Sequence, residues 1–267
     1  MSEFPYAVFR RILASCASYS VVATGSHHVP RSGPGVIISN HPSFLDPWVI
    51  ATAIERPIHW VSASFVSQLP VVGFFAKLLG AVPLRHTQTL RSRTLIQDVG
   101  RLLRDGQVVG IFPEGLDGMR CGQPWREPAD FHKTFALAVL KAKIPFLPIV
   151  PVALTPLNSP WQITLPAHLV QRLDPFEPAF QSGTLNLVIY RRVACCVGRP
   201  TTWDASYPLF DRFVSQNHNG AAIALASALA GRTRAKVKAL LLRSHRTGNT
   251  RQAIENHLKQ TLAPPLA

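Results

Sequence analysis

Short apolar runs of strand length alternate with stretches of helical periodicity between residues 36 and 153. Apolar runs of this kind are typical of strands buried on both faces, and their alternation with helices favours a helix-covered sheet. We therefore predict an α/β fold, a single domain with a mostly buried mixed sheet flanked by helices. We expect strands at 36–39, 58–63, 82–84, 108–112, 148–153, 184–190 and 192–197, and helices at 71–79, 89–105, 133–143 and 219–259.

Two terminal segments flank this domain, which we place at residues 30–205. Residues 1–29 form an amphipathic segment, and 4–24 within it predict a helix that rests in a membrane headgroup layer or packs on the core. Residues 206–267 form a basic helical extension. It holds nine Lys and Arg against Asp211 and Glu255, so +7 of the formal +14 charge falls there. This excess favours anionic partners, including an anionic membrane surface.

The sequence predicts a protein that lies on a membrane without crossing it. A spanning helix needs about 20 consecutive apolar residues, and every candidate segment falls short. The N-terminus lacks the ordered regions of a secretory signal, which favours the cytoplasmic face. The cysteine spacing fits neither a zinc ligand set nor a disulfide framework, and it indicates a reducing compartment. The four cysteines are Cys16, Cys121, Cys195 and Cys196.

A histidine follows the first apolar run, and an aspartate stands five positions later. We expect Pro42 to begin a helix there, because its fixed φ suits a first helical turn. The turn would bring the carboxylate of Asp46 to one imidazole nitrogen of His41, leaving the other nitrogen to accept a proton from a hydroxyl. Such pairs also arise by chance, so a helix-capping aspartate and a core histidine are the alternatives.

Three later segments give the pair its context. Gly80 and Arg85 enclose four residues, a Phe-Pro-Glu-Gly sequence occupies 112–115, and a proline-edged apolar run occupies 148–153. Together with residues 40–46, these segments resemble the four ordered motifs of the glycerol-phosphate and lysophosphatidate acyltransferase superfamily. The resemblance covers about 115 residues and implies acyl transfer from a thioester to a lipid hydroxyl.

The resemblance also implies roles for individual residues. His41 corresponds to the catalytic base and Asp46 to the carboxylate that orients it, while Arg85 corresponds to the arginine that contacts the acceptor phosphate. The family requires no metal or bound cofactor, and acyl-CoA or acyl-carrier protein is the donor substrate. The alternatives are a solvated charge at Arg85 and a plain turn at 112–115. The expected substrate-binding residues are Asn40, Arg85, Glu114, Gly115, Arg120 and Lys133. At Gly115 we expect a close approach of the backbone, because glycine has no side chain.

Two departures from the family pattern affect the acceptor. Members commonly continue after Gly115 with a hydroxyl residue and then arginine, whereas here Arg120 follows only after four other residues. We expect Arg120 to substitute from this longer loop. The second departure lies at residues 131–134, where members usually place glycine after the basic pair and this chain has Thr134. Lys133 of that pair would contact an anionic headgroup or the thioester donor, or else be an exposed lysine at a helix start. The expected acceptor is a lysophospholipid, foremost 1-acylglycerol-3-phosphate giving phosphatidic acid, with lyso-ornithine lipid as an alternative.

A nucleic-acid-binding protein is the rival from another class, because the sequence pI is about 10.5. Its bases are not interleaved with stacking aromatic residues, and no nucleic-acid-binding motif occurs. A hydrolase is disfavoured as well, because the sequence contains no Gly-x-Ser-x-Gly elbow. We therefore expect an acyl thioester and a lysolipid as partners, and no nucleic acid.

Overall fold

The computed structural model describes residues 20–62, 66, 73, 82–83, 88–120, 127–157, 161–170, 183–203 and 219–261. Several sequence predictions lie outside these residues. They are the N-terminal segment before residue 20, most of the helix expected at 71–79, and Arg85.

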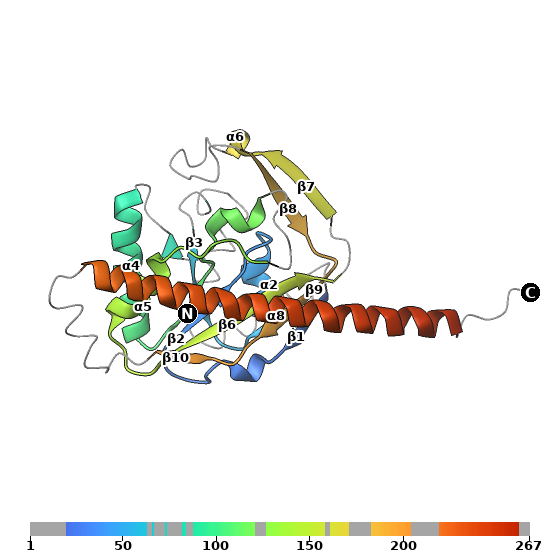
Figure 1. The fold of residues 1–267 in the computed structure, drawn as a ribbon, viewed down its shortest axis with the longest axis horizontal. Coiled ribbons are helices and arrows are strands. Elements are labelled where there is room, and N and C mark those ends of the chain that lie inside the picture. The colour runs from blue at the N-terminus through green and yellow to red at the C-terminus, as the bar shows by residue number, and fades with distance from the viewer. Residues whose placement is uncertain are drawn as a thin grey trace, which may run out of the picture.

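A mixed sheet of eight strands forms the centre of the described structure (Figure 1). Its order is β1-β9-β6-β2-β5-β3-β4, with β10 paired to β6. The strands β2, β3, β5 and β6 run parallel to one another, so their carboxyl ends meet at one edge. The bounds are β1 Ser20–Thr24, β2 Gly35–Ser39, β3 Ile58–Ser62, β4 Val82–Pro83, β5 Val108–Ile111, β6 Leu147–Pro156, β9 Arg192–Val197 and β10 Thr201–Trp203.

Helices cover both faces of this sheet, which confirms the predicted fold class. The alternation of β2 places Ile37 in the core layer shared with α2, and Val36 and Ile38 in the layer shared with α4, α5 and α8. Burial on both faces explains why the strand sequences are continuous apolar runs. The helices are α2 Asp46–Ala53, α4 Gln88–Arg104, α5 Thr134–Ala142, α6 Ala167–Val170 and α8 Asn219–Thr261, with 3-10 turns η1 Ser26–His28 and η3 Gly115–Met119.

A separate hairpin lies beside the central sheet, at the upper right of Figure 1. Its strands are β7 (Trp161–Pro166) and β8 (Thr184–Ile189), which pair antiparallel along their whole length. A two-stranded hairpin is marginally stable alone, so its position depends on contacts with the rest of the domain.

The helix predicted for 4–24 is wrong at its C-terminal end. Residues 20–24 form β1, which pairs in parallel with β9 and places Ser20 opposite Arg192. The segment contains two valines and a threonine, β-branched residues that suit a strand when a neighbouring edge is open to pairing. Tertiary pairing therefore decided a conformation that apolar composition alone left ambiguous.

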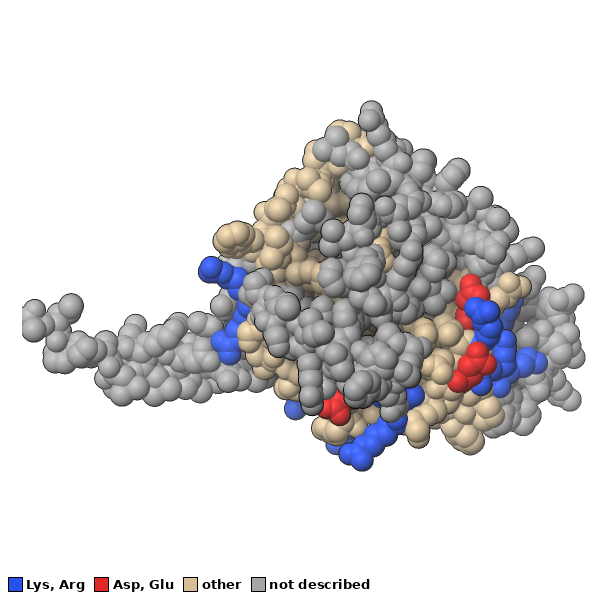
Figure 2. Space-filling view, turned by 180° about the vertical axis from the view of Figure 1, so that it is seen from behind, with Lys and Arg blue, Asp and Glu red and all other residues tan. Residues whose placement is uncertain are grey.

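The basic C-terminal extension is one long helix that starts on the domain. Its N-terminal half packs on the sheet through Ala226, Val237 and Leu241, and its far end runs beyond the sheet in Figure 1. Two of its bases turn inward toward residues 127–130. On the opposite face of the molecule, which Figure 2 shows, bases and acids also lie side by side at the right. No helix among the described residues combines the length and the apolarity that crossing a bilayer requires.

Candidate active site

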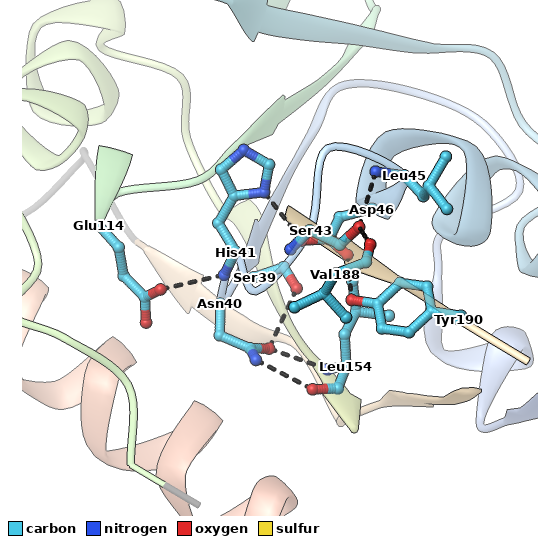
Figure 3. A network of polar contacts seen from close by, with 10 residues as sticks. All are labelled: Ser39, Asn40, His41, Ser43, Leu45, Asp46, Glu114, Leu154, Val188 and Tyr190. Carbon is cyan, nitrogen blue, oxygen red and sulfur yellow. Dashed lines mark hydrogen bonds and ion pairs between the residues drawn. The ribbon is translucent and has the colours of Figure 1, made fainter. Parts of the chain in front are cut away.

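His41 and Asp46 face each other just beyond the carboxyl end of β2 (Figure 3). The imidazole Nδ1 of His41 lies 2.9 Å from Oδ2 of Asp46. The backbone amide of Ser43 donates to the same oxygen at 2.8 Å, and the amide of Asp46 donates back to the Ser43 carbonyl at 3.1 Å. The turn between β2 and α2 therefore brings together the two residues that the sequence singled out.

The predicted helix start at Pro42 is wrong by four residues. Helix α2 begins at Asp46, and Pro47 is the proline in its first turn. Pro42 instead belongs to the preceding turn, where the Ser43 hydroxyl accepts a hydrogen bond from the Leu45 amide at 3.1 Å. This shift places the Asp46 carboxylate at the N-terminus of the helix, where the helix dipole favours a negative charge.

Asp46 is fully buried and accepts hydrogen bonds from three groups. Besides His41 and Ser43, the phenol of Tyr190 donates to Oδ1 at 2.6 Å. Burial raises the pKa of Asp46, and the bonds from His41, Tyr190 and Ser43 act in the opposite direction by stabilising the carboxylate. Tyr190 directly follows β8, 144 residues from its partner, so no local spacing in the sequence indicates this contact.

The ring of His41 stacks on an aromatic row. Phe112 lies parallel to it with ring centroids 4.0 Å apart, and Trp60 stacks behind Phe112 at 4.9 Å. Gly110 leaves the space for this row, because a Cβ there would come within 2.5 Å of the Trp60 ring. The stack fixes the imidazole plane, and the side chain remains 13% exposed with Nε2 pointing away from the polar network (Figure 3).

Glu114 reaches the same turn from the end of β5. Its Oε2 accepts a hydrogen bond from the backbone amide of His41 at 3.0 Å. Burial raises the pKa of Glu114 to about 8, although hydrogen bonds from the His41 and Ala129 backbone and the charge of Arg234 act to lower it. The acid is thus largely protonated in the folded protein at neutral pH, and it still accepts a bond through its carbonyl oxygen.

Gly118 is a site residue that the sequence analysis missed. A Cβ at this position would overlap Oε2 of Glu114 and lie 2.9 Å from the carbonyl oxygen of His41. The close approach expected at Gly115 therefore occurs at Gly118. Gly115 is required for another reason, because its φ of 57° lies in the left-handed region. The sequence signal that could have indicated this position is the second glycine in the loop.

A cleft opens beside the pair, between the loops after β2 and β5 and the hairpin. Arg120 lies on its wall with Glu114, and its Nε donates to Asp117 at 2.7 Å. Residues 127–128 form another part of the wall, and α8 holds them in place. Arg234 donates to the carbonyl of Pro128 at 2.7 Å. The lining residues are Asn40, Pro42, Glu114, Gly118, Met119, Arg120, Glu127, Pro128, Asn186 and Val188.

Asn40 and Lys133 differ in their surroundings from the other predicted site residues. Asn40 lines the cleft, but its amide group pairs with the backbone of Leu154, donating at 3.0 Å and accepting at 2.8 Å. It thereby joins β2 to β6. Lys133 is exposed at the N-cap of α5 and is not among the described residues that line the cleft. In the described part of the chain, no three His, Cys, Asp or Glu side chains are grouped as metal ligands.

Comparison with known proteins identifies the family. The family model described as Acyltransferase matches residues 20–155, which include His41, Asp46 and Glu114. The chain belongs to the acyltransferase family. The match begins at β1 and ends within β6, so it covers the parallel strands whose carboxyl ends meet at the His41–Asp46 pair.

Two curated relatives and one solved structure extend this finding. A chloroplastic 1-acyl-sn-glycerol-3-phosphate acyltransferase of Brassica napus is 30% identical over 146 residues, 52% of this chain and 40% of that protein. The lyso-ornithine lipid O-acyltransferase of Rhizobium meliloti is 33% identical over 92 residues, 34% of this chain and 31% of that protein. The matches thus span less than half of the curated relatives' own length.

The solved structure is the 1-acyl-sn-glycerophosphate acyltransferase PlsC of Thermotoga maritima. It shares the fold with a TM-score of 0.51 and 16% sequence identity, over 89% of this chain and 80% of that one. The likeness therefore extends well beyond the residues matched by the family model, into the segments that follow β6.

We predict that Gly118→Ala destabilises the protein by about 1–3 kcal/mol, because the added methyl group forces Glu114 away from the His41 amide. Urea denaturation measures the free energy of unfolding. Gly231→Ala is the matched control, since Gly231 is an exposed helical position with open space for a Cβ. Equal stability of Gly118→Ala and wild type would rule out the tight packing of this loop against Glu114.

The raised pKa of Glu114 predicts a pH-dependent stability. The folded state keeps a proton that the unfolded chain loses above pH 4.5, so the free energy of unfolding should fall as pH rises toward about 8. Glutamine cannot titrate. Between pH 4.5 and about 8, the free energy of unfolding of Glu114→Gln should therefore fall by up to about 1.4 kcal/mol less per pH unit than that of wild type. Urea denaturation across the window tests this, with Glu55→Gln as the control at an exposed position. Parallel stability curves for Glu114→Gln and wild type would contradict the assignment.

Proposed function

We propose that this protein is an O-acyltransferase that moves a fatty acyl group from acyl-CoA or acyl-carrier protein to the hydroxyl of a lysophospholipid. The proposed acceptor is 1-acylglycerol-3-phosphate, and the product is phosphatidic acid. The observation that carries the proposal is the hydrogen-bonded His41–Asp46 pair at the sheet edge of an acyltransferase-family chain.

In this proposal His41 acts as a general base. Asp46 accepts a bond from Nδ1, which leaves Nε2 unprotonated and able to take the proton of the acceptor hydroxyl. The hydroxyl oxygen attacks the thioester carbonyl carbon, so a carbon–oxygen bond forms as the carbon–sulfur bond breaks. The imidazolium then returns its proton to the departing thiolate. No covalent acyl-enzyme and no metal enters this sequence of steps.

The position of Arg120 supports an acceptor that carries phosphate. Arg120 lines the cleft, and a guanidinium offers several planar donors that suit phosphate oxygens. Arg85 is assigned to the same phosphate through the family motif. The Brassica napus relative, whose name specifies 1-acyl-sn-glycerol-3-phosphate, supports this choice.

A lyso-ornithine lipid is the second candidate acceptor, favoured by the Rhizobium meliloti relative. Its headgroup presents an amino acid in place of phosphate, so its binding would depend less on Arg85 and Arg120. The altered loop after Gly115 is the feature of this chain that makes the second acceptor worth testing.

We also propose that the protein works at the cytoplasmic face of a membrane as a peripheral protein. The proposed acceptor and product are bilayer lipids, and the formal charge of +14 attracts the chain to anionic headgroups. Acyl-CoA and acyl-carrier protein are anionic as well, so the same charge assists encounter with either donor.

His41→Ala should reduce turnover by about 10²-fold or more, as expected for loss of a general base. Thiol release from an acyl thioester measures the rate, over a panel of lysophosphatidate, glycerol 3-phosphate, other lysolipids and lyso-ornithine lipid. Product mass identifies the acceptor. His27→Ala is the control, because His27 is an exposed histidine outside the Asp46 network. Unchanged turnover in His41→Ala would exclude the mechanism.

Tyr190 is a positioning residue in this mechanism, because it acts through Asp46. Tyr190→Phe removes a donor that stabilises the carboxylate, so the His41–Asp46 pair should bind its proton more tightly. We expect kcat/KM to fall about tenfold, the cost of one hydrogen bond to a charged group. The acidic limb of the kcat/KM pH profile should also move to higher pH. A lower rate with an unmoved profile would indicate a purely structural role.

A further inference from the structure

The outer face of the β7–β8 hairpin exposes large apolar side chains. Trp161 is 65% exposed, Ile163 49% and Ile189 38%. The pairing register places Trp161 directly opposite Ile189, and the two-residue period of a strand places Ile163 on the same face. These are half of the exposed large apolar side chains among the described residues, and such clustering marks an interaction surface.

The opposite face of the hairpin turns toward the candidate active site. Asn186 and Val188 alternate with Ile189 along β8, and both line the cleft beside Glu114. The hydroxyl of Ser43 donates to the Val188 carbonyl at 2.6 Å. The exposed apolar face therefore belongs to an element that is fixed to the turn carrying the catalytic pair.

A base, Arg191, lies against this apolar face. The guanidinium carbon of Arg191 lies 5.8 Å from the centre of the Trp161 ring, and neither hairpin strand contains Asp or Glu. Figure 2 shows the corresponding flank, at the upper left, as a tan strip above the described charged side chains. Tryptophan beside arginine at the edge of an apolar surface is characteristic of the membrane–water interface.

We propose that the outer face of the β7–β8 hairpin docks on an anionic lipid bilayer, with Trp161 and Ile163 entering the headgroup region. The charge favours this occupant over a second copy of the chain, because a two-fold contact through the same face would bring two copies of Arg191 together. The inference rests on the proposed function, in which the acceptor passes from the bilayer into a cleft that the same hairpin lines.

Vesicle binding of the full chain tests this surface. Vesicles of equimolar phosphatidylcholine and phosphatidylglycerol are sedimented with wild type, Trp161→Gln, Ile163→Gln and the double variant. We expect the partition coefficient of the double variant to fall roughly tenfold or more, in keeping with the apolar area withdrawn from the bilayer. Phe146→Asn is the matched control: Phe146 is 64% exposed on the turn between α5 and β6, and asparagine tolerates its φ of 54°.

A second measurement uses a milder substitution. Brominated acyl chains should quench the tryptophan fluorescence of wild type more than that of Trp161→Phe. The inference is overturned if the double variant binds as well as wild type, or if Phe146→Asn weakens binding equally. If light scattering shows a dimer for wild type and a monomer for the double variant, the face binds a second copy of the chain instead of a bilayer.

Activity separates this inference from the proposed function. Thiol release with detergent-dispersed lysolipid should be equal in wild type and the hairpin variants, because the substituted side chains lie outside the cleft. Loss of vesicle binding with retained thiol release supports docking. A wild-type chain that binds vesicles through the hairpin but acylates no acceptor would contradict the proposed function and leave the surface assignment standing.

Discussion

The buried carboxylate of Asp46 joins the segments on which the site depends. An ionised carboxylate without exposure is costly unless several donors compensate it, and here His41, Ser43 and Tyr190 all donate to it. Those donors come from the β2–α2 turn and from the residue after β8. Asp46 therefore orients the imidazole, closes the turn and holds the hairpin next to the cleft.

The C-terminal helix contributes to the same architecture from the other side. Arg234 bonds the carbonyls of Pro128 and Ala129, and Lys238 bonds Glu127 at 2.6 Å. Residues 127–128 line the cleft, so bases of α8 position one of its walls. The first half of the extension therefore packs against the residues that line the cleft, and some of its positive charge is engaged within the protein rather than available to a partner.

The family match and the site geometry support different parts of the functional proposal. Membership rests on residues 20–155, and the His41–Asp46 pair within that region fits the activation of a hydroxyl. The alternative of a nucleic-acid-binding protein rested only on the positive charge of the chain. The hydrogen-bonded His41–Asp46 pair has no role in that alternative. Within the proposal, acceptor choice is assigned to the loop from Gly115 to Arg120, where the residues after Gly115 depart from the common family motif.

The sequence by itself determined the features that local geometry controls. Apolar runs and helical periods predicted the alternating strands and helices. The five-residue spacing of His41 and Asp46 predicted that the two side chains could meet across one turn, and the ordered motifs distinguished this pair from a chance spacing. Tertiary structure alone decided the contacts between distant segments. Tyr190 reaches Asp46 across 144 residues and Glu114 reaches the His41 amide across 73. Such contacts depend on how strands pair and how loops pack. Strand pairing also made residues 20–24 a strand, and loop packing placed at Gly118 the close backbone approach that was expected at Gly115.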